Sequence, residues 1–508
     1  MSQPSSTTRP PVARDSSLDL SETELTRLST EINKLVIEYF DEIRDRPLFP
    51  QIAGGDTIDQ VGGDLSGAGE SLDKLIADCR TILLGSRHNG HPRFFGYVAS
   101  PATPVGAFGD LVASALNANV TSWRSGPAAT EIERTVVRWL GSLIGYSDKA
   151  YGLLTSGGSL ANTTALLVAQ RNKASGEVAR EGLWKQDTPM TIYASQEVHM
   201  SIPKAADILG FGREQVRTVA CDEKFRLDVR SLRERLEQDC RNGLQPFCVV
   251  ASAGTVNTGA VDPLADIADL ASEFGIWFHV DGAYGAPGSL DPRKRPLFTG
   301  LDRADSVSLD PHKWLYVPLD AGCLLFRDEA AARAAFTAGD ADYIKVLEEN
   351  ATESFAFWDY GTELSRRFRA LKIWLTLRYY GTDRLAAAIT DDISLAQYLA
   401  EQIELADDFE LLALPELSIC CFRYLSKVGR EKLAASTAEE GEQIERELDD
   451  LNQRIMLTVQ RGGEAYVSNA TIHGKFALRA CITNFRTTKQ DIDKTLEIIR
   501  AAGLSSAP

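Results

Sequence analysis

Short apolar runs alternate with helical patterns between about residue 150 and residue 330, and this alternation limits the fold more than any other feature of the chain. The runs include TIYAS, FCVVASAG, IWFHVDGAYG and GCLLFR. Runs of this length that are rich in β-branched and aromatic residues predict buried strands, and strands separated by helices predict a largely parallel sheet. The sequence therefore predicts an α/β domain built around such a sheet.

Helical patterns flank this region on both sides. Before it, apolar residues recur every three or four positions in SLDLSETELTRLSTEINKLVIEYFDEI and in RTVVRWLGSLIGY. After it, residues 362–380 predict one long helix, and strand and helix patterns follow from about residue 386. We predict three parts: a disordered tail with an N-terminal helical segment over 1–105, a large domain over 106–385, and a small α+β domain over 386–508.

The charge of the chain excludes several kinds of partner. It has 54 Lys and Arg against 71 Asp and Glu, a net charge of −17, which repels nucleic-acid backbones and anionic membrane surfaces. No segment has the about 18 uncharged apolar residues that span a bilayer, and the N-terminus lacks the apolar core of a secretory signal. The eight cysteines form no CxxC pair, so we expect reduced thiols, no metal site and a cytoplasmic protein.

The stretch YGLLTSGGSLANTTALLVAQR, residues 151–171, runs from an apolar strand through Ser-Gly-Gly-Ser into a helix. Free backbone amides and the positive end of the helix dipole meet at such a turn and favour an anion. A tight strand-to-helix connection explains the same pattern without a ligand, so this stretch alone leaves both interpretations open. Neither the Rossmann fingerprint nor a P-loop occurs in the chain.

Two ionisable residues follow buried strands further along the chain. Asp281 ends the run FHVD, and Lys313 stands in SLDPHKWLYVP after another apolar run. A carboxylate or an ammonium at such a position is costly to bury unless it is paired, hydrogen-bonded or used covalently. Taken singly, Asp281 is equally well explained as a cap of the next turn, and Lys313 as a solvated side chain.

Together with the Gly-rich turn, these two residues meet the requirements of one cofactor. Pyridoxal 5'-phosphate (PLP) needs an anion clamp for its phosphate, a carboxylate for its pyridine nitrogen and a lysine amine for covalent attachment. The chain offers these three in that order along an α/β domain. We therefore predict that Lys313 carries PLP and that His312 lies beside the phosphate.

Several motifs also resemble a known family. DPHKW, HVDGAYG, HPRFFGY, GPAATEIE and RRFRALKIW resemble motifs of the PLP-dependent group II amino-acid decarboxylases, among them the aromatic-L-amino-acid decarboxylases, from about His91 to Arg486. The resemblance implies PLP fold type I, with a mostly parallel seven-stranded sheet and helices on both faces. It also implies a homodimer with shared active sites and decarboxylation of an L-amino acid to the amine and CO2.

The resemblance also assigns roles to single residues. Asp281 would bind the ring nitrogen of PLP, and His199 in SQEVHMSIPKA would stack on the ring. The other implied cofactor contacts are Gly158, Ser159, Thr255, Ala283 and His312, and the implied substrate pocket comprises Val98, Ser100, Thr121 and Trp123. The chain departs from the family at Asp310, where Asn is frequent. An added negative charge near the phosphate is unfavourable unless it faces away or is protonated, so its role stays open.

The product depends on the group that returns a proton after CO2 leaves. In the family, a mobile loop of the neighbouring subunit brings a tyrosine over the substrate's Cα at a fixed distance before the paired arginines, and counting back from Arg366 gives Phe357. Relatives with Phe there release an aldehyde by oxidative deamination. Tyr360 supplies the hydroxyl instead if the loop contains a gap, and His199 is retained as in amine-forming members. We expect the amine, with the aldehyde as the alternative.

The substrate is less constrained by the sequence. Val98, Ala99 and Thr121 stand where aromatic-specific members of the family have bulky residues, and these smaller residues either widen the pocket for a large ring or remove its stacking partners. Apart from Arg124, no Arg or Lys in these segments is placed to bind a side-chain carboxylate, so we expect an aromatic or otherwise uncharged substrate, with glutamate or aspartate as the alternative. A protein that binds the cofactor without turnover is a third hypothesis, and the set of Lys313, Asp281 and His199 argues against it.

Overall fold

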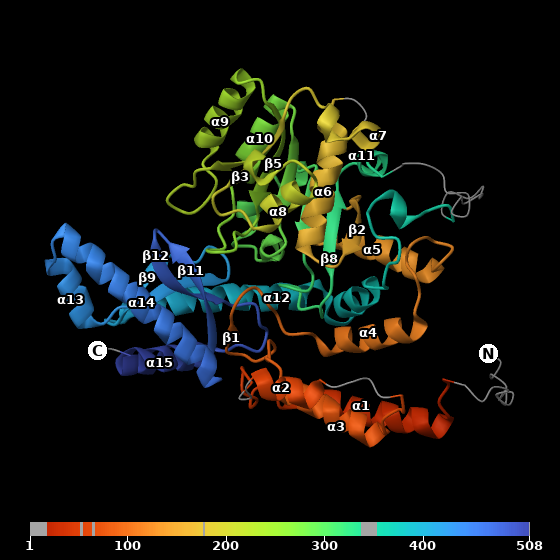
Figure 1. Cartoon of the computed structure of the whole chain (residues 1–508), viewed down its shortest axis with the longest axis horizontal. Coiled ribbons are helices and arrows are strands. Elements are labelled where there is room, and N and C mark those ends of the chain that lie inside the picture. The colour runs from red at the N-terminus through yellow and green to blue at the C-terminus, as the bar shows by residue number, and fades with distance from the viewer. Residues whose placement is uncertain (1–17, 51–53, 63–66, 176–177, 337–352, 507–508) are drawn as a thin grey trace. The chain divides into compact units, whose positions relative to one another are not determined.

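The structure, a computed structural model, describes residues 18–50, 54–62, 67–175, 178–336 and 353–506 (Figure 1). The chain divides into two compact units, residues 1–87 and 88–508. The first contains α1 (Glu22–Asp41), α2 (Gly54–Val61) and α3 (Leu72–Leu84). The division falls at residue 87 rather than at the predicted 105, because β1 (Phe94–Phe95) pairs in parallel with a strand close to the C-terminus.

A seven-stranded sheet forms the centre of the second unit, in the order β2-β8-β7-β6-β5-β3-β4. Strands β3 to β7 are parallel to one another, and β8 is antiparallel to both β7 and β2. The mostly parallel sheet is therefore confirmed. The bounds are β2 (Tyr151–Thr155), β3 (Met190–Ser195), β4 (Val216–Val219), β5 (Gln245–Ser252), β6 (Trp277–Asp281), β7 (Ser306–Leu309) and β8 (Gly322–Phe326).

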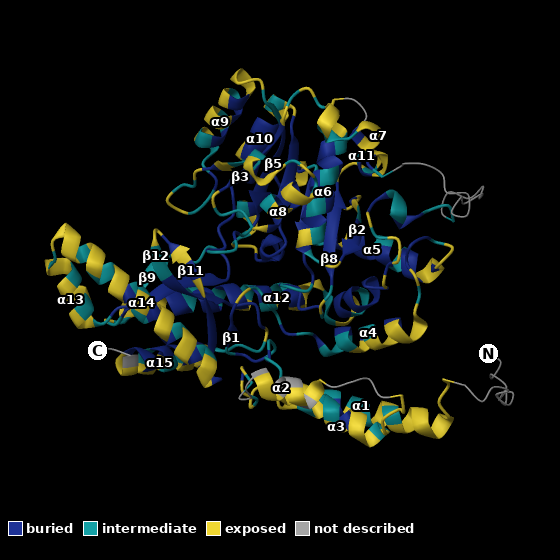
Figure 2. Cartoon of the chain, viewed as in Figure 1, coloured by how far each residue is buried: buried dark blue, intermediate teal, exposed yellow. Residues whose placement is uncertain are grey.

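Two groups of helices pack on this sheet. Helix α6 lies against β5 to β8 and beside α8, whereas α9 and α10 pack together and against β5. Apolar strands covered in this way are buried along their length, as Figure 2 shows by the dark blue sheet. The helices of this region are α4 (Pro104–Leu116), α5 (Pro127–Leu143), α6 (Gly158–Lys173), α7 (Val178–Glu181), α8 (Ser201–Ile208), α9 (Val229–Arg241), α10 (Leu264–Phe274), α11 (Glu329–Ala334) and α12 (Ala370–Leu405).

The register of the parallel strands brings three polar residues into one row. Ser252 at the end of β5 is paired with Asp281 at the end of β6, and Asp281 is paired with Ser308 in β7. Because parallel strands end at one edge of the sheet, the loops that follow them meet there. The segments that carry the predicted site residues are therefore neighbours in space.

A second, five-stranded sheet has the order β1-β11-β12-β10-β9 and forms the C-terminal part. Its strands are β9 (Phe409–Ala413), β10 (Ile419–Tyr424), β11 (Tyr466–Ile472) and β12 (Lys475–Cys481), and its helices are α13 (Lys427–Ala435), α14 (Ala438–Gly462) and α15 (Lys489–Ser506). The predicted boundary at residue 385 falls inside α12, four residues after Gly381, where the backbone leaves the helical conformation (φ 72°, ψ 167°) and the helix is kinked.

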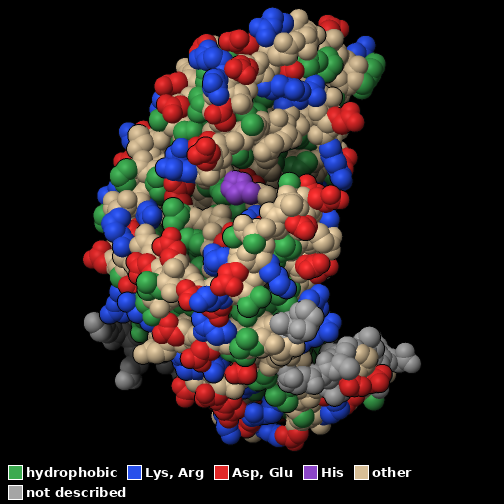
Figure 3. Space-filling view, turned by 90° about the vertical axis from the view of Figure 1, so that its left-hand side faces the viewer, with side chains coloured by type: hydrophobic (Ala, Val, Ile, Leu, Met, Phe, Trp, Pro, Cys, Tyr) green, Lys and Arg blue, Asp and Glu red, His purple; other side chains and the backbone are tan. Residues whose placement is uncertain are grey.

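The surface agrees with the charge argument made from the sequence. Acidic and basic side chains are interspersed on the face shown in Figure 3. Among the described residues, no helix is both long and apolar enough to cross a membrane, and no group of ligating side chains is arranged to hold a metal ion. All eight cysteines are free thiols.

Candidate active site

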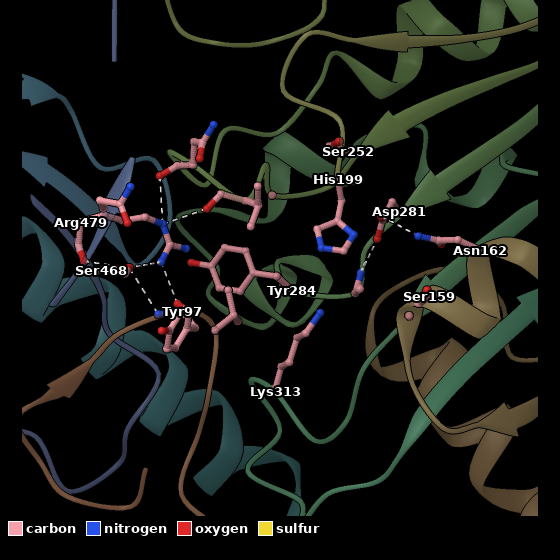
Figure 4. A pocket seen from close by; sticks show the side chains of 17 residues that line it. Tyr97, Ser159, Asn162, His199, Ser252, Asp281, Tyr284, Lys313, Ser468 and Arg479 are labelled. Carbon is pink, nitrogen blue, oxygen red and sulfur yellow. Dashed lines mark hydrogen bonds between the residues drawn. The ribbon is translucent and has the colours of Figure 1, made fainter. Parts of the chain in front are cut away.

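A cavity of about 350 Å³ lies at the carboxyl edge of the large sheet and is also lined by residues of the small sheet (Figure 4). The large domain contributes Lys313, Asp281, His199 and the first turn of α6. The opposite wall includes Arg479 and Ser468, together with Tyr97 (Figure 4). The full lining is Tyr97, Val98, Gly158, Ser159, Asn162, His199, Ser252, Gly254, Val256, Asn257, Asp281, Ala283, Tyr284, Lys313, Ser468, Asn469 and Arg479.

Asp281 presents an ionised carboxylate to this cavity. Its Oδ1 accepts hydrogen bonds from the backbone N–H of Ala283 and from Ser308 Oγ, both at 3.1 Å, and its Oδ2 accepts one from Asn162 Nδ2 at 2.8 Å. Burial raises the pKa of Asp281, but the charges of Lys313 and the nearby histidines outweigh it and bring the pKa below its usual value. A buried carboxylate held in this way favours a cationic partner.

Asn162 connects Asp281 with the histidine that faces the cavity. Its Nδ2 also donates to Ser201 Oγ at 2.9 Å, and Ser201 Oγ lies 2.8 Å from His199 Nδ1. Since the backbone N–H of Ser201 donates to the same Nδ1, this nitrogen is an acceptor and the proton of the neutral ring lies on Nε2. Burial lowers the pKa of His199, so His199 offers the cavity a neutral imidazole.

Lys313 follows β7 and reaches into the cavity from below in Figure 4. Its side chain is 22% exposed, and Nζ lies 2.8 Å from Asp310 Oδ2. Burial lowers the pKa of Lys313, but the charge and hydrogen bond of Asp310 and the charge of Asp281 raise it above its usual value overall. Lys313 is thus a protonated amine in an ion pair that a ligand can reach.

The first turn of α6 meets the same cavity. Gly157 has φ +157°, and a Cβ on Gly158 would lie 3.0 Å from both Ala283 Cβ and Asp310 Oδ2. A larger residue at position 158 would therefore force its neighbours to shift. The backbone approaches the loops after β6 and β7 closely here, and the N-terminus of α6 faces the cavity beside Ser159.

Arg479 on β12 is a buried cation without an ion-pair partner among the described residues. Its side chain is 3% exposed. Nε donates to the carbonyl oxygens of Val256 and Asn257. Nη1 donates to the carbonyl oxygen of Tyr97 and to Ser468 Oγ. Nη2 is buried and has no hydrogen-bond partner. A buried guanidinium that keeps one free donor at a cavity is suited to an anion.

Five predicted contacts lie outside this cavity. Thr255 is buried beside Thr258, although its neighbours Gly254 and Val256 line the cavity. His312 Nδ1 accepts from the backbone N–H of Ala321, and Ser100 Oγ donates to the carbonyl of His312. Thr121 and Trp123 lie on a separate segment that pairs with residues 355–357 through backbone hydrogen bonds. Of the predicted substrate pocket, only Val98 lines the cavity of its own chain.

Phe357 and Tyr360, which are expected to reach the cavity of a neighbouring subunit, do not line the cavity of their own chain. Phe357 is 0% exposed, and the guanidinium of Arg366 covers its ring at 4.1 Å from the centroid. Tyr360 is also buried, and its hydroxyl donates to Glu329 Oε1 at 2.5 Å. Both residues belong to the interior around α5 and β2, where the large apolar area of two aromatic rings is removed from water. The count from the paired arginines gave no indication of this burial.

The sequence interpretation missed Asn162, Ser201 and Arg479. Asn162 stands four residues after Gly158, which on a helix places both on one face, so the spacing in GGSLAN offered a signal. Ser201 stands two residues after His199 and was within reach of the same argument. Arg479 lies more than 160 residues beyond Lys313 in sequence, as the numbering shows, and no local pattern links the two.

The cavity fits PLP on the observations above. An ionised, buried carboxylate is available to a protonated ring nitrogen, the N-terminus of α6 with its first residue a glycine is available to a phosphate, and an accessible lysine lines the same cavity. These are the three contacts expected from the sequence. The α/β fold and this arrangement define the class of PLP enzymes of fold type I.

Comparison with known proteins agrees with this class. A family model described as the pyridoxal-dependent decarboxylase conserved domain matches residues 55–425. An aromatic-L-amino-acid decarboxylase of Bacillus atrophaeus is 33% identical over 95% of this chain and 96% of its own, and a 4-hydroxyphenylacetaldehyde synthase of Rhodiola rosea is 30% identical over 97% and 99%. A crystal structure of Oryza sativa TDC with PLP and tryptamine has a TM-score of 0.85 and 27% identity, and covers 96% of this chain and 99% of that one.

The chain belongs to the pyridoxal-dependent decarboxylase family. It is a PLP-dependent carboxy-lyase that acts on amino acids, and the resemblance to this family inferred from its motifs is confirmed.

Proposed function

We propose that this enzyme decarboxylates an L-amino acid with an aromatic or otherwise uncharged side chain to the amine and CO2. The free Nη2 of Arg479 carries the proposal. Every amino-acid substrate brings an α-carboxylate, and among the described residues that line the cavity only Lys313 and Arg479 are cations. Lys313 serves the cofactor, so Arg479 is left for one carboxylate. A second carboxylate, on an acidic side chain, has no cationic partner there.

The residues of the cavity divide the work between cofactor and substrate. Bound PLP supplies the electron sink that accepts the electron pair of the breaking Cα–carboxylate bond. Asp281 would hold a proton on the ring nitrogen, the α6 N-terminus with Gly158 and Ser159 would bind the phosphate, and Lys313 would bind the aldehyde carbon. His199 lies on the cavity side with its Nε2 proton available, and Tyr97 and Tyr284 offer aromatic surface to the substrate.

Ligands with and without a carboxylate test the role of Arg479. In Arg479→Met, the dissociation constant of an aromatic L-amino acid should rise about 10- to 100-fold, because a charge-assisted hydrogen bond is lost. The corresponding aromatic amine, which has no carboxylate, should bind as to the wild type. Arg500→Met, which removes the partner of Asp408 at the surface, is the control. Equal weakening of both ligands would contradict the assignment.

Glutamate and aspartate are the second candidate substrates, because Arg479 alone also suits a side-chain carboxylate. Assay of CO2 release from a panel of L-amino acids separates the two. Turnover of glutamate above that of tyrosine, tryptophan and phenylalanine would favour the acidic class. In that case Arg479→Met should also weaken the binding of the amine product, since that product keeps its side-chain carboxylate.

We propose the amine rather than the aldehyde as product. His199, retained as in amine-forming members of the family, faces the cavity. Of the tyrosines between Lys313 and Arg366, Tyr316 bonds to the buried carboxylate of Asp392, Tyr360 bonds to Glu329, and Tyr343 lies outside the described residues. Amine, aldehyde and peroxide should be measured together for the wild type and for Tyr343→Phe. If the wild type releases mainly aldehyde, together with an equal amount of peroxide, the proposal is overturned.

We further propose a homodimer in a reducing compartment such as the cytoplasm. The free state of all eight thiols supports the compartment. An apolar strip on α4 supports a second copy as partner: Phe108, Leu111, Val112 and Leu116 are 39%, 53%, 56% and 61% exposed. Their spacing places them on one face of the helix, and its other face, with Gly106, Gly109 and Ala113, is buried.

A further inference from the structure

Asp310 occupies an unusual place for a carboxylate. It directly follows β7, is 1% exposed, and lies within contact of the first turn of α6, since its Oδ2 is 3.0 Å from where a Cβ on Gly158 would stand. Its Oδ2 pairs with Lys313 Nζ at 2.8 Å, whereas its Oδ1 is buried without a hydrogen-bond partner. The carboxylate therefore lies between the lysine and the helix N-terminus that are assigned to the cofactor.

Binding of the cofactor would change the surroundings of the Asp310 carboxylate at both Lys313 and the N-terminus of α6, and both changes would destabilise its negative charge. Attachment of PLP would join Lys313 Nζ to the aldehyde carbon and release the carbonyl oxygen as water together with two protons of the ammonium. Nζ would then keep at most one N–H for Asp310. The phosphate would bring negative charge to the α6 N-terminus, close to Oδ2. A buried carboxylate that loses hydrogen-bond donors and gains a like charge nearby is destabilised.

We propose that Asp310 makes this enzyme hold its cofactor less tightly than the rest of the site would allow. In the cofactor-free protein the carboxylate pairs with the Lys313 ammonium, and part of that interaction would be given up on loading because Nζ loses hydrogen-bond donors. The protein thereby favours exchange between its free and loaded forms. The inference rests on the cofactor of the proposed function and is independent of the substrate.

Few other titratable groups face Asp310. His312 Nε2 lies 3.7 Å from its Oδ2, and His199 interacts with it from the loop after β3. Burial lowers the pKa of both histidines, so neither replaces the charge of Lys313 near neutral pH. Cys323 on β8 is the remaining titratable neighbour, and burial raises the pKa of its thiol well above the usual value.

The isosteric substitution Asp310→Asn tests the proposal. It removes the charge and keeps the volume, so the dissociation constant of PLP, measured from the visible absorption of the attached cofactor, should fall at least about tenfold. The rate at which PLP dissociates should fall as well. Pyridoxal without phosphate should show a smaller gain, since only the ion-pair contribution applies to it.

Controls keep the outcomes distinct. Asp305→Asn removes a carboxylate from the other end of β7, where it pairs with Arg327, and should leave PLP affinity unchanged. Asp310→Ser provides a second variant if Asp310→Asn unfolds, and thermal unfolding of the cofactor-free proteins identifies that case. PLP affinity of both variants equal to or weaker than that of the wild type overturns the inference. Failure of the wild type to attach PLP would instead overturn the cofactor assignment itself.

Discussion

At the scale of single residues, one chain of hydrogen bonds with a fixed donor direction sets the protonation of Asp281 and His199. Trp277 Nε1 donates to Ser306 Oγ, which leaves the Ser306 hydroxyl to donate to His279 Nδ1, and His279 Nε2 then donates to Asn162 Oδ1. Burial lowers the pKa of His279 to about 4, so this ring stays neutral. The two Nδ2 protons of Asn162 are thereby directed at Asp281 and Ser201. The chain thus holds Asp281 and His199 in one protonation pattern.

Asn162→Ala should lower kcat about 10- to 100-fold while the cofactor stays bound, because a hydrogen bond to a charged group contributes about 1.5–3 kcal/mol. Asn162 is a positioning residue, so the pH profile of kcat should shift as well. Asn172→Ala, on the same helix but bonded only to backbone carbonyls, is the matched control. Steady-state kinetics with the bound cofactor quantified by absorption decide the matter, and equal kcat for the two variants would count against this role.

The sequence predicted the residues that lie at strand ends and missed those that act through them. Asp281 and Lys313 were recognisable because an ionisable residue directly after a buried run must have a partner. Arg479 was not, because its place at the cavity depends on β12 meeting the loop that contains Val256. Counting along a loop gave Phe357 but says nothing about which side chains are buried in their own chain.

At the scale of elements, α12 supports the loop that carries Lys313. Asp392 on this helix accepts hydrogen bonds from Trp314 Nε1 at 2.9 Å and Tyr316 OH at 2.7 Å, and the backbone N–H of Asn484 donates to its other oxygen. The alternation of strands and helices predicted the large sheet, whereas the helix predicted over residues 362–380 matches only the first part of α12, which begins at Ala370 and ends at Leu405. The alternation could not predict that β1 joins β11, since pairing across more than 360 residues, as their numbering shows, has no local signature.

Asp392 also predicts a pH dependence of stability. Burial raises its pKa from 3.8 to about 7, so between about pH 4 and about pH 7 the folded protein keeps a proton that the unfolded chain has released. The contribution of Asp392 to the free energy of unfolding therefore decreases as the pH rises through this window. Asp392→Asn should flatten this part of the pH profile in denaturant titrations. Asp407→Asn, at an exposed residue just beyond α12, is the control, and an unchanged slope in Asp392→Asn would refute the assignment.

At the scale of the whole molecule, the apolar strip on α4 stays exposed among the described residues. Gly109 allows α4 to approach α12 closely, because a Cβ there would lie 3.0 Å from Lys372 Cα. The helix is thus fixed on its buried side, while its apolar residues face outward over two turns. The sequence implied a dimer only through resemblance, since an exposed apolar face is recognisable only once the buried face of the same helix is known.

Charge placed on this strip should separate the two subunits. Leu111→Glu combined with Val112→Glu puts two carboxylates where a second copy would have to remove them from water, which is strongly unfavourable. The molar mass from light scattering should fall from that of a dimer to that of a monomer, and CO2 release should be lost with it if the active sites are shared. Val428→Glu, at a residue of α13 that is 60% exposed, adds a charge outside the strip and should remain dimeric and active. A doubly substituted protein that stays dimeric would show that α4 is not the interface, whereas an active monomer would show that each cavity is complete within its own chain.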